Sequence, residues 1–468
     1  MAKKYFLLFS KIVLISLGLV SCKDSFSDSN DVAYFGGEVE NPTSRFILFC
    51  KDGEVLDTIP LKKDNTFLKK MDSLPSGLYS FKNEPEFQYV YFDKNDSIMV
   101  HIDSDNFDES IVFCGRGGEK NNFLIEMFLK NEKDKNDLFD AFDLNFKAFD
   151  AKIDKINKEN QKVYESKKDE INWDANFDTY ANALVNLPYF SKKEIYPILH
   201  KMRTGADVFN NLPANYYSYR QNVDLNNEKL IHFSPYTSCI NMMLTNTATV
   251  KYHNHLSEID QALKTSINKL HNADTLIKNE KVKNTVLNSI AFQYLLEDQN
   301  MIHVNEFLLV YKSISTDKSK KNEITNLGNS IQQLTAGKPV PSINLIDTNG
   351  TTFASSDLIN SKTIFFFWTE NLKSHFDGAH KKAVEFQIKH PEIQFISINL
   401  DLNPDNWKSI IKQNSFPNIK EYHCKDFSEL KSKWAITKVH RIIIVNKDKT
   451  IKNGFGNMFD VNFEKELE

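Results

Sequence analysis

Thiols are the first groups to consider for chemistry, because cysteines exchange disulfides, bind metals or carry lipids. The chain has 468 residues and five cysteines, and no two of these are close in sequence: Cys22, Cys50, Cys114, Cys239 and Cys424. This spacing excludes a Cys-x-x-Cys pair, a zinc knuckle and a dense disulfide scaffold. Cys50 and Cys114 fall on strand-like segments of one predicted domain, so a disulfide between these two stays open.

Cys424 is the one cysteine beside a potential base, because it follows His423 in the run YHCKD. A Cys–His pair acts as a nucleophile when a third group orients the base and both side chains share a pocket. The sequence identifies no such third group, so we interpret Cys424 as a structural residue. We predict no catalytic residue, no cofactor and no metal centre.

The charge balance excludes one class of partner. Lys and Arg number 58 against 62 Asp and Glu, which gives a net charge of −4. A nucleic-acid-binding protein usually carries a basic surplus, so we expect no nucleic-acid partner. Five of the basic residues are arginines, which argues against anion recognition by a guanidinium cluster.

The N-terminus has the pattern of an export signal. Two lysines precede Tyr5–Val20, an almost wholly apolar run of 16 residues that is short for a membrane span. Residues 19–22 read LVSC, which resembles a bacterial lipobox. The resemblance implies that residues 1–21 are a cleaved signal peptide and that Cys22 carries lipid. An uncleaved anchor or a core helix ending in Cys22 is the alternative.

Residues 22–31 are polar and are predicted to form a tether between the lipid and the folded chain. Lys23 and Asp24 resemble the export signal of surface lipoproteins in Bacteroidetes. We therefore expect a lipid-anchored protein of the cell envelope, on the periplasmic or the surface face of the outer membrane. The membrane is the expected partner of Cys22.

Three regions follow the tether, and the chain is predicted to be multidomain. Residues 32–118 contain short aromatic and β-branched runs separated by Gly, Pro, Asn and Asp, which predict a β-sandwich or open barrel. The order of Gly37, Leu48, Gly53, Phe67 and Gly77 resembles the β-rich domain of unknown function that precedes thioredoxin domains in Bacteroidetes lipoproteins. The resemblance implies a role in packing or binding.

Residues 119–335 change to a helical period and are predicted to form an α-helical spacer. Apolar residues spaced 3, 4, 3, 4 and 3 apart predict a single helix face that packs on another helix: Phe139, Phe142, Phe146, Phe149, Ile153 and Ile156. Further helices are predicted at 259–270, 282–296 and 302–314. Helix breaks are predicted at three prolines, Pro188, Pro197 and Pro213. A solvated loop is predicted around His253 and His255.

Residues 336–468 predict an α/β sheet with an antiparallel edge, because strand and helix patterns alternate and a strand–turn–strand closes the region. The region resembles the TlpA-like branch of the thioredoxin superfamily, also called redoxin or AhpC/TSA-like. The matching segments are, in order, Pro341 with Leu345–Asp347, Phe365–Trp368, Ile396–Asp401 with Trp407, and Trp434–Asp448. The resemblance implies a thioredoxin-like fold.

The residues that carry the family's reaction are replaced. The family places Cys-x-x-Cys at a helix N-terminus shortly after the Phe-Trp strand, where the helix lowers the first thiol's pKa. Leu372 stands at the first cysteine position and His375 at the second, and no cysteine lies between 239 and 424. His440 stands where the family has the cis-proline that faces this motif.

These replacements lead to three hypotheses. The first is a redox-inactive binding or scaffold module with a protein partner at the thioredoxin-like groove. The second is a thiol–disulfide oxidoreductase of the cell envelope, and the third is an accessory solute- or glycan-binding lipoprotein that works through the β-rich domain. His375 and His440 could also hold a metal, although Glu370 is the nearest carboxylate in sequence and no third ligand is evident.

Overall fold

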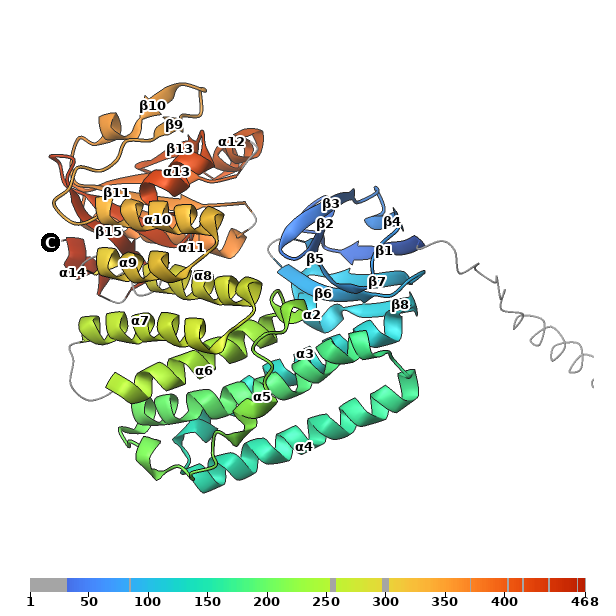
Figure 1. Cartoon of the computed structure of the whole chain (residues 1–468). Coiled ribbons are helices and arrows are strands. Elements are labelled where there is room, and N and C mark those ends of the chain that lie inside the picture. The colour runs from blue at the N-terminus through green and yellow to red at the C-terminus, as the bar shows by residue number, and fades with distance from the viewer. Residues whose placement is uncertain are drawn as a thin grey trace, which may run out of the picture.

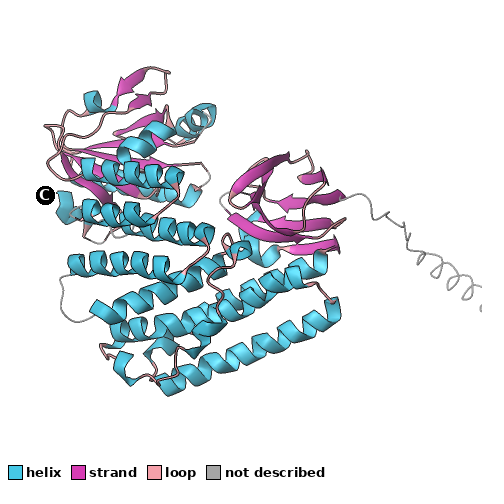
Figure 2. Ribbon diagram, viewed as in Figure 1, coloured by secondary structure: helices cyan, strands magenta, loops and turns pink. Residues whose placement is uncertain are grey.

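The computed structural model describes residues 32–83, 86–252, 258–296, 303–370, 372–401, 404–414, 416–436, 438–460 and 462–467. The signal-peptide and tether predictions, with Cys22, lie outside these residues, as do His253 and His255. Within the described ranges no helix combines the length and apolar character needed to cross a membrane. Strands gather in two separate groups, and most of the helices are stacked beneath both groups in this view (Figure 2).

The N-terminal strands form two four-stranded sheets in the described part of this domain, ordered β4-β1-β7-β8 and β3-β2-β5-β6 (Figure 1). The strands are β1 (Val32–Glu40), β2 (Phe46–Lys51), β3 (Glu54–Pro60), β4 (Thr66–Asp72), β5 (Gly77–Asn83), β6 (Glu86–Phe92), β7 (Ser97–Asp103) and β8 (Val112–Arg116), with α2 (Phe107–Ser110) before β8. β1 runs parallel to β7, and the other neighbours are antiparallel.

Aromatic side chains fill the space between the two sheets. Alternation along β5 turns Tyr79 and Phe81 inward, and the ring of Phe35 lies 5.5 Å from that of Phe81 and 5.6 Å from that of Phe49. Gly37 allows β1 to approach β7, because a Cβ at this position would lie 1.9 Å from the carbonyl oxygen of Val100. The β-sandwich prediction is thus confirmed in its main feature, two facing sheets around one apolar core.

Eight α-helices follow in the described residues: α3 (Gly118–Asp137), α4 (Phe146–Ile171), α5 (Ala175–Thr204), α6 (Ser234–Tyr252), α7 (Glu258–Leu276), α8 (Glu280–Leu296), α9 (Val304–Ile314) and α10 (Lys318–Gln333). The predictions for 259–270, 282–296 and 302–314 correspond to α7, α8 and α9. The single-helix prediction for the phenylalanine stripe is wrong, because a 3-10 turn (Phe139–Asp143) ends before Asn145 caps α4. Phe149 and Ile153 still pack around Tyr196, whereas Phe139 is exposed.

The prolines of α5 do not break it, contrary to the prediction. Pro188 and Pro197 lie inside the helix and cannot donate to the carbonyls four residues earlier. Side chains from other elements replace the missing donors: Asn131 Nδ2 donates to the oxygen of Leu184 at 3.2 Å. The hydroxyl of Tyr216 donates to the oxygen of Lys193 at 2.8 Å. The helix therefore continues because both carbonyls keep a partner.

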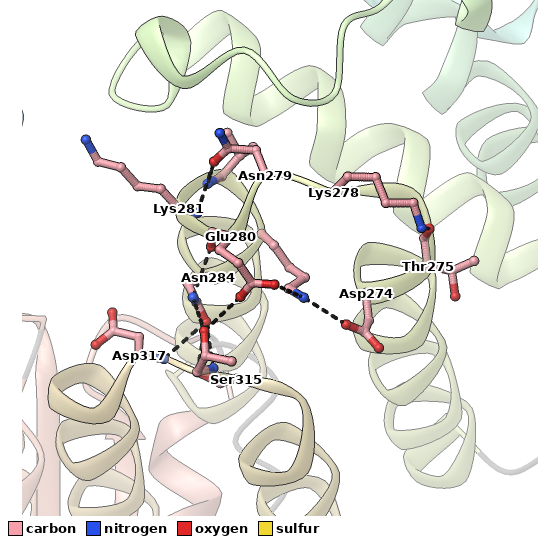
Figure 3. Close-up of polar contacts among 12 residues, drawn as sticks. Asp274, Thr275, Lys278, Asn279, Glu280, Lys281, Asn284, Ser315 and Asp317 are labelled. Atoms are coloured by element: carbon pink, nitrogen blue, oxygen red, sulfur yellow. Dashed lines mark hydrogen bonds and ion pairs between the residues drawn. The ribbon is translucent and has the colours of Figure 1, made fainter.

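An asparagine in the first turns of α8 binds the turn between α9 and α10 (Figure 3). Asn284 Oδ1 accepts from the backbone N–H of Thr316 at 3.0 Å and from the hydroxyl of Ser315 at 3.2 Å. Asn279 Oδ1 caps the start of α8 by accepting from the N–H of Lys281 at 3.0 Å. These bonds fix the start of α8 and its position against the turn that leads into α10.

The C-terminal domain is built on a seven-stranded sheet, counted over the described residues, with the order β10-β9-β13-β12-β11-β14-β15. Its elements are β9 (Asn344–Ile346), β10 (Thr352–Ala354), β11 (Thr363–Trp368), α11 (Lys373–Lys389), β12 (Gln394–Asn399), α12 (Pro404–Gln413), β13 (Ile419–Cys424), α13 (Phe427–Trp434), β14 (Arg441–Val445), β15 (Ile451–Asn457) and α14 (Phe463–Leu467). β11, β12 and β13 are parallel and β14 is antiparallel to β11. The predicted α/β sheet with an antiparallel edge is confirmed.

Both faces of this sheet are covered, which accounts for the apolar run that follows Thr363 in β11. Ile364 and Phe366 pack with α11 and α14 on one face. Phe365 and Phe367 face α13 and belong to an apolar cluster that continues into the helical region. The helical region is therefore more than the predicted spacer, because it shares one continuous core with the C-terminal sheet.

Candidate binding site at the start of helix α11

The loop after β11 leads directly into α11, as the sequence predicted. β11 ends at Trp368, and Leu372 is the residue that caps the N-terminus of α11. The Leu372 side chain makes no capping hydrogen bond, and His375 follows one helical turn later. The structure thus puts a leucine and a histidine at the turn where the helix dipole would activate a thiol.

His375 is held in place by the strand that precedes it. Its Nε2 donates to the carbonyl oxygen of Phe367 at 3.0 Å, and its ring lies 5.7 Å from that of Phe459. Burial lowers the pKa of His375; the hydrogen bond to Phe367 opposes that shift, and nearby His440 adds to it. Neutral His375 can therefore donate one hydrogen bond and accept another at this site.

His440 is exposed and lies in the turn before β14. The charged form of His440 contributes to the lowering of the His375 pKa, and the predicted metal pair of His375 and His440 stays a prediction. A metal would need a third ligand, and no group of three His, Cys, Asp or Glu side chains suited to a metal occurs in the described residues. Glu370 is directed elsewhere, since its Oε1 accepts from Asn406 Nδ2 at 3.1 Å.

The described cysteines do not replace the missing thiols. Cys424 is buried at the end of β13, and burial raises its pKa to about 11. Neighbouring His423 is engaged elsewhere, with Nδ1 3.0 Å from Oδ1 of Asn399 and its ring stacked on Trp407. His423 is thus not arranged as a base for Cys424.

The other described thiols lie outside this domain. Cys239 is buried in α6, and burial raises its pKa to about 12. Cys50 is buried and Cys114 exposed, and none of the four described cysteines forms a disulfide. The disulfide that the sequence left open between Cys50 and Cys114 is therefore absent.

A buried polar group beneath α11 was not found from the sequence. His380 is fully buried; its Nε2 lies 3.2 Å from the hydroxyl of Ser397 and 3.3 Å from Oε1 of Glu421. Trp368 Nε1 donates to the same hydroxyl at 2.8 Å. Ser397 and Glu421 are cross-strand partners on β12 and β13. A polar side chain in an otherwise apolar strand was the sequence signal for this group. The contact with His380 could not be predicted, because it depends on the register of β12 against β13.

A larger cavity lies between the N-terminal sheets and the helical region. Its volume is about 510 Å³, a common size for small-molecule sites. Its lining combines aromatic rings, among them Tyr79 and Tyr180, with three lysines and two carboxylates: Lys51, Lys229, Lys281, Asp52 and Glu228. Lys51 lies over the ring of Tyr79 at 4.0 Å, and burial lowers the pKa of Lys51.

Comparisons with known proteins give likenesses to solved structures. No protein family model matches the chain, and no curated protein matches it. A thioredoxin-like protein from Bacteroides caccae is similar at 14% identity, over 59% of this chain and 92% of that one, with a TM-score of 0.35. The thioredoxin domain of a thiol-disulfide oxidoreductase from Bacteroides vulgatus is similar at 18% identity, over 25% and 86%, with a TM-score of 0.21.

A third likeness is to a thiol:disulfide interchange protein from Bacteroides sp., at 18% identity over 25% of this chain and 80% of that one, with a TM-score of 0.23.

Proposed function

We propose that the protein is an exported, lipid-anchored binding or scaffold protein whose C-terminal thioredoxin-like domain does not exchange disulfides. The observation that carries this proposal is the start of α11, where Leu372 and His375 stand in place of two thiols. An isobutyl group cannot attack a disulfide sulfur, and imidazole cannot resolve a mixed disulfide. The described cysteines are remote from this turn in sequence or are buried with raised pKa values.

The anchoring part of the proposal rests on residues 1–31. The basic start, the apolar run Tyr5–Val20 and the sequence LVSC at 19–22 support cleavage before Cys22 and attachment of lipid to it. Mass spectrometry of the envelope-extracted protein tests this part. An acylated N-terminal peptide that begins at Cys22, lost in Cys22→Ser, is the expected result, and an intact Met1 N-terminus on a membrane-bound chain contradicts it.

Mixed-disulfide trapping tests the absence of exchange. The Cys22→Ser chain is incubated with a disulfide-bonded peptide and the products are separated without reductant. We expect no covalent adduct at Cys424 in the folded chain. An adduct that disappears in Cys424→Ala would instead assign the protein to the oxidoreductases.

We also propose a second candidate function, solute binding in the 510 Å³ cavity beside the N-terminal sheets. The lining holds three lysines against the carboxylates of Asp52 and Glu228, so aromatic rings beside this small basic surplus favour a solute that has a flat face and an acidic group. Thermal shift measurements with glucuronate, and with maltose as a neutral probe, test it. A shift with glucuronate that is lost in Lys51→Gln and kept in Lys63→Gln, an exposed lysine outside the cavity lining, supports the proposal; no shift with either sugar contradicts it.

A further inference from the structure

One of the chain's five arginines is buried at the edge of the thioredoxin-like domain. Arg441 begins β14 and is 6% exposed. Its Nε and Nη2 donate to the carbonyl oxygen of Gly454 at 2.8 and 2.6 Å, and Nη1 donates to that of Ala435 at 2.6 Å. The guanidinium also lies 4.0 Å from the ring centre of Phe455.

These contacts leave the charge without a counter-ion. A guanidinium has five N–H donors, so three bonds leave two N–H groups available. No carboxylate in the described residues forms an ion pair with Arg441. Arg220 shows the usual arrangement, because it grips the buried Glu194 through two bonds of 2.7 and 2.6 Å. Burial without such a partner lowers the pKa of Arg441 to about 9.

Arg441 also lines a small pocket that carries further positive charge. The pocket has a volume of about 140 Å³, and Lys438, His440 and Asn457 line it beside Arg441. Leu296, at the end of α8, closes it from the helical region. No Asp or Glu is among the described residues that line it. The volume suits one small anionic group and is below that of drug-sized sites.

We propose that this pocket binds a carboxylate, which the free N–H groups of Arg441 hold while Lys438 attracts it and the His440 ring lines the pocket beside it. Guanidinium and carboxylate pair with matched geometry, and an anion here would compensate a buried cation that has no carboxylate partner among the described residues. The carboxylate belongs to a small organic acid or to an acidic segment of a bound polypeptide. The polypeptide form rests on the proposed binding function, and the small-acid form is independent of it.

Acetate is the probe for the site itself. The melting temperature of the full Cys22→Ser chain is measured over increasing sodium acetate, with sodium chloride at equal ionic strength as reference. Because a ligand that binds only the folded state stabilises it, acetate should raise the melting temperature above the chloride reference. We expect Lys438→Gln/His440→Asn to weaken apparent acetate affinity by about fivefold, since one exposed cation such as Lys438 contributes up to about a factor of five. Lys420→Gln, an exposed lysine on β13, should leave the affinity unchanged.

Equal responses to acetate and chloride, or an unchanged affinity in the double variant, would overturn the proposal. Arg441→Lys keeps the positive charge but loses the paired N–H donors of the guanidinium. This variant should abolish the rise in melting temperature that acetate causes. If that variant does not fold, the double variant still decides the matter, because Lys438 and His440 are both exposed.

Two peptides distinguish the two possible sources of the carboxylate, a small organic acid and an acidic segment of a polypeptide. Acetyl-Gly-Asp-Gly-amide and acetyl-Gly-Asn-Gly-amide differ in one charge. Tighter binding of the Asp peptide than of acetate supports the polypeptide form. Acetate binding with no response to the Asp peptide supports the small-acid form and overturns the other. None of these outcomes depends on whether the domain exchanges disulfides, so a failure here is distinct from a failure of the proposed function.

Discussion

Tyr216 provides a test of how α5 continues through a proline. Its hydroxyl is the described donor to the Lys193 carbonyl that Pro197 leaves without a helical N–H, and Tyr216 is 4% exposed. Tyr216→Phe removes the donor and leaves a buried acceptor. Leaving a buried polar group unsatisfied costs about 1–3 kcal/mol, so we expect the free energy of unfolding to fall by that amount.

Pro197→Ala supplies the matched background, because an alanine at this position brings back the helical N–H for the Lys193 carbonyl. In that background Tyr216→Phe should cost at least about 1 kcal/mol less, as the carbonyl keeps a partner in either case. Urea unfolding of the four chains gives the coupling. Tyr236→Phe, which removes a 2.8 Å bond to the carbonyl of Asp224, should cost the same in both backgrounds. Equal costs of Tyr216→Phe in the two backgrounds would refute the reasoning.

Three further predictions concern the site and the helical region. NMR titration of His375 should give a midpoint below 6.5, because burial lowers its pKa. The contribution of His375 to the free energy of unfolding is then full above pH 6.5 and is lost as the pH falls. A midpoint at or above 6.5 would contradict this prediction. Iodoacetamide at pH 8 should label exposed Cys114 in the folded chain, and peptide mass spectrometry can locate the label. Cys239 and Cys424 should react only after unfolding, because burial raises their pKa values to about 12 and 11. Asn284→Ala should lower the free energy of unfolding by about 1–2 kcal/mol, because the backbone N–H of Thr316 loses its acceptor; an unchanged urea midpoint would contradict that role.

Local patterns predicted the strands and helices of the C-terminal domain well. The apolar run of β11 and the position of α11 both follow from residue type and period, since a strand covered on two faces has few polar positions. The helical region was harder, because the fate of a proline depends on distant donors. Asn131 and Tyr216 rescue α5 from positions that no local pattern connects to it.

The candidate site was predicted in part. Leu372 and His375 were singled out by the resemblance of this segment to a family motif, and the structure places both at the start of α11. The buried partners of His380 and the burial of Arg441 among backbone carbonyls depend on strand register and on packing between distant segments. Such features have no counterpart in sequence spacing, so reasoning from the sequence could not find them.

Insulin reduction by dithiothreitol, followed by turbidity, tests the central claim most directly. The account predicts that the folded Cys22→Ser chain gives no acceleration over dithiothreitol alone. Leu372→Cys/His375→Cys restores two thiols at the start of α11 and is predicted to accelerate the reaction, which shows that the assay can detect exchange at this turn. Acceleration by the chain with Leu372 and His375 in place, lost in Cys424→Ala, would contradict the account.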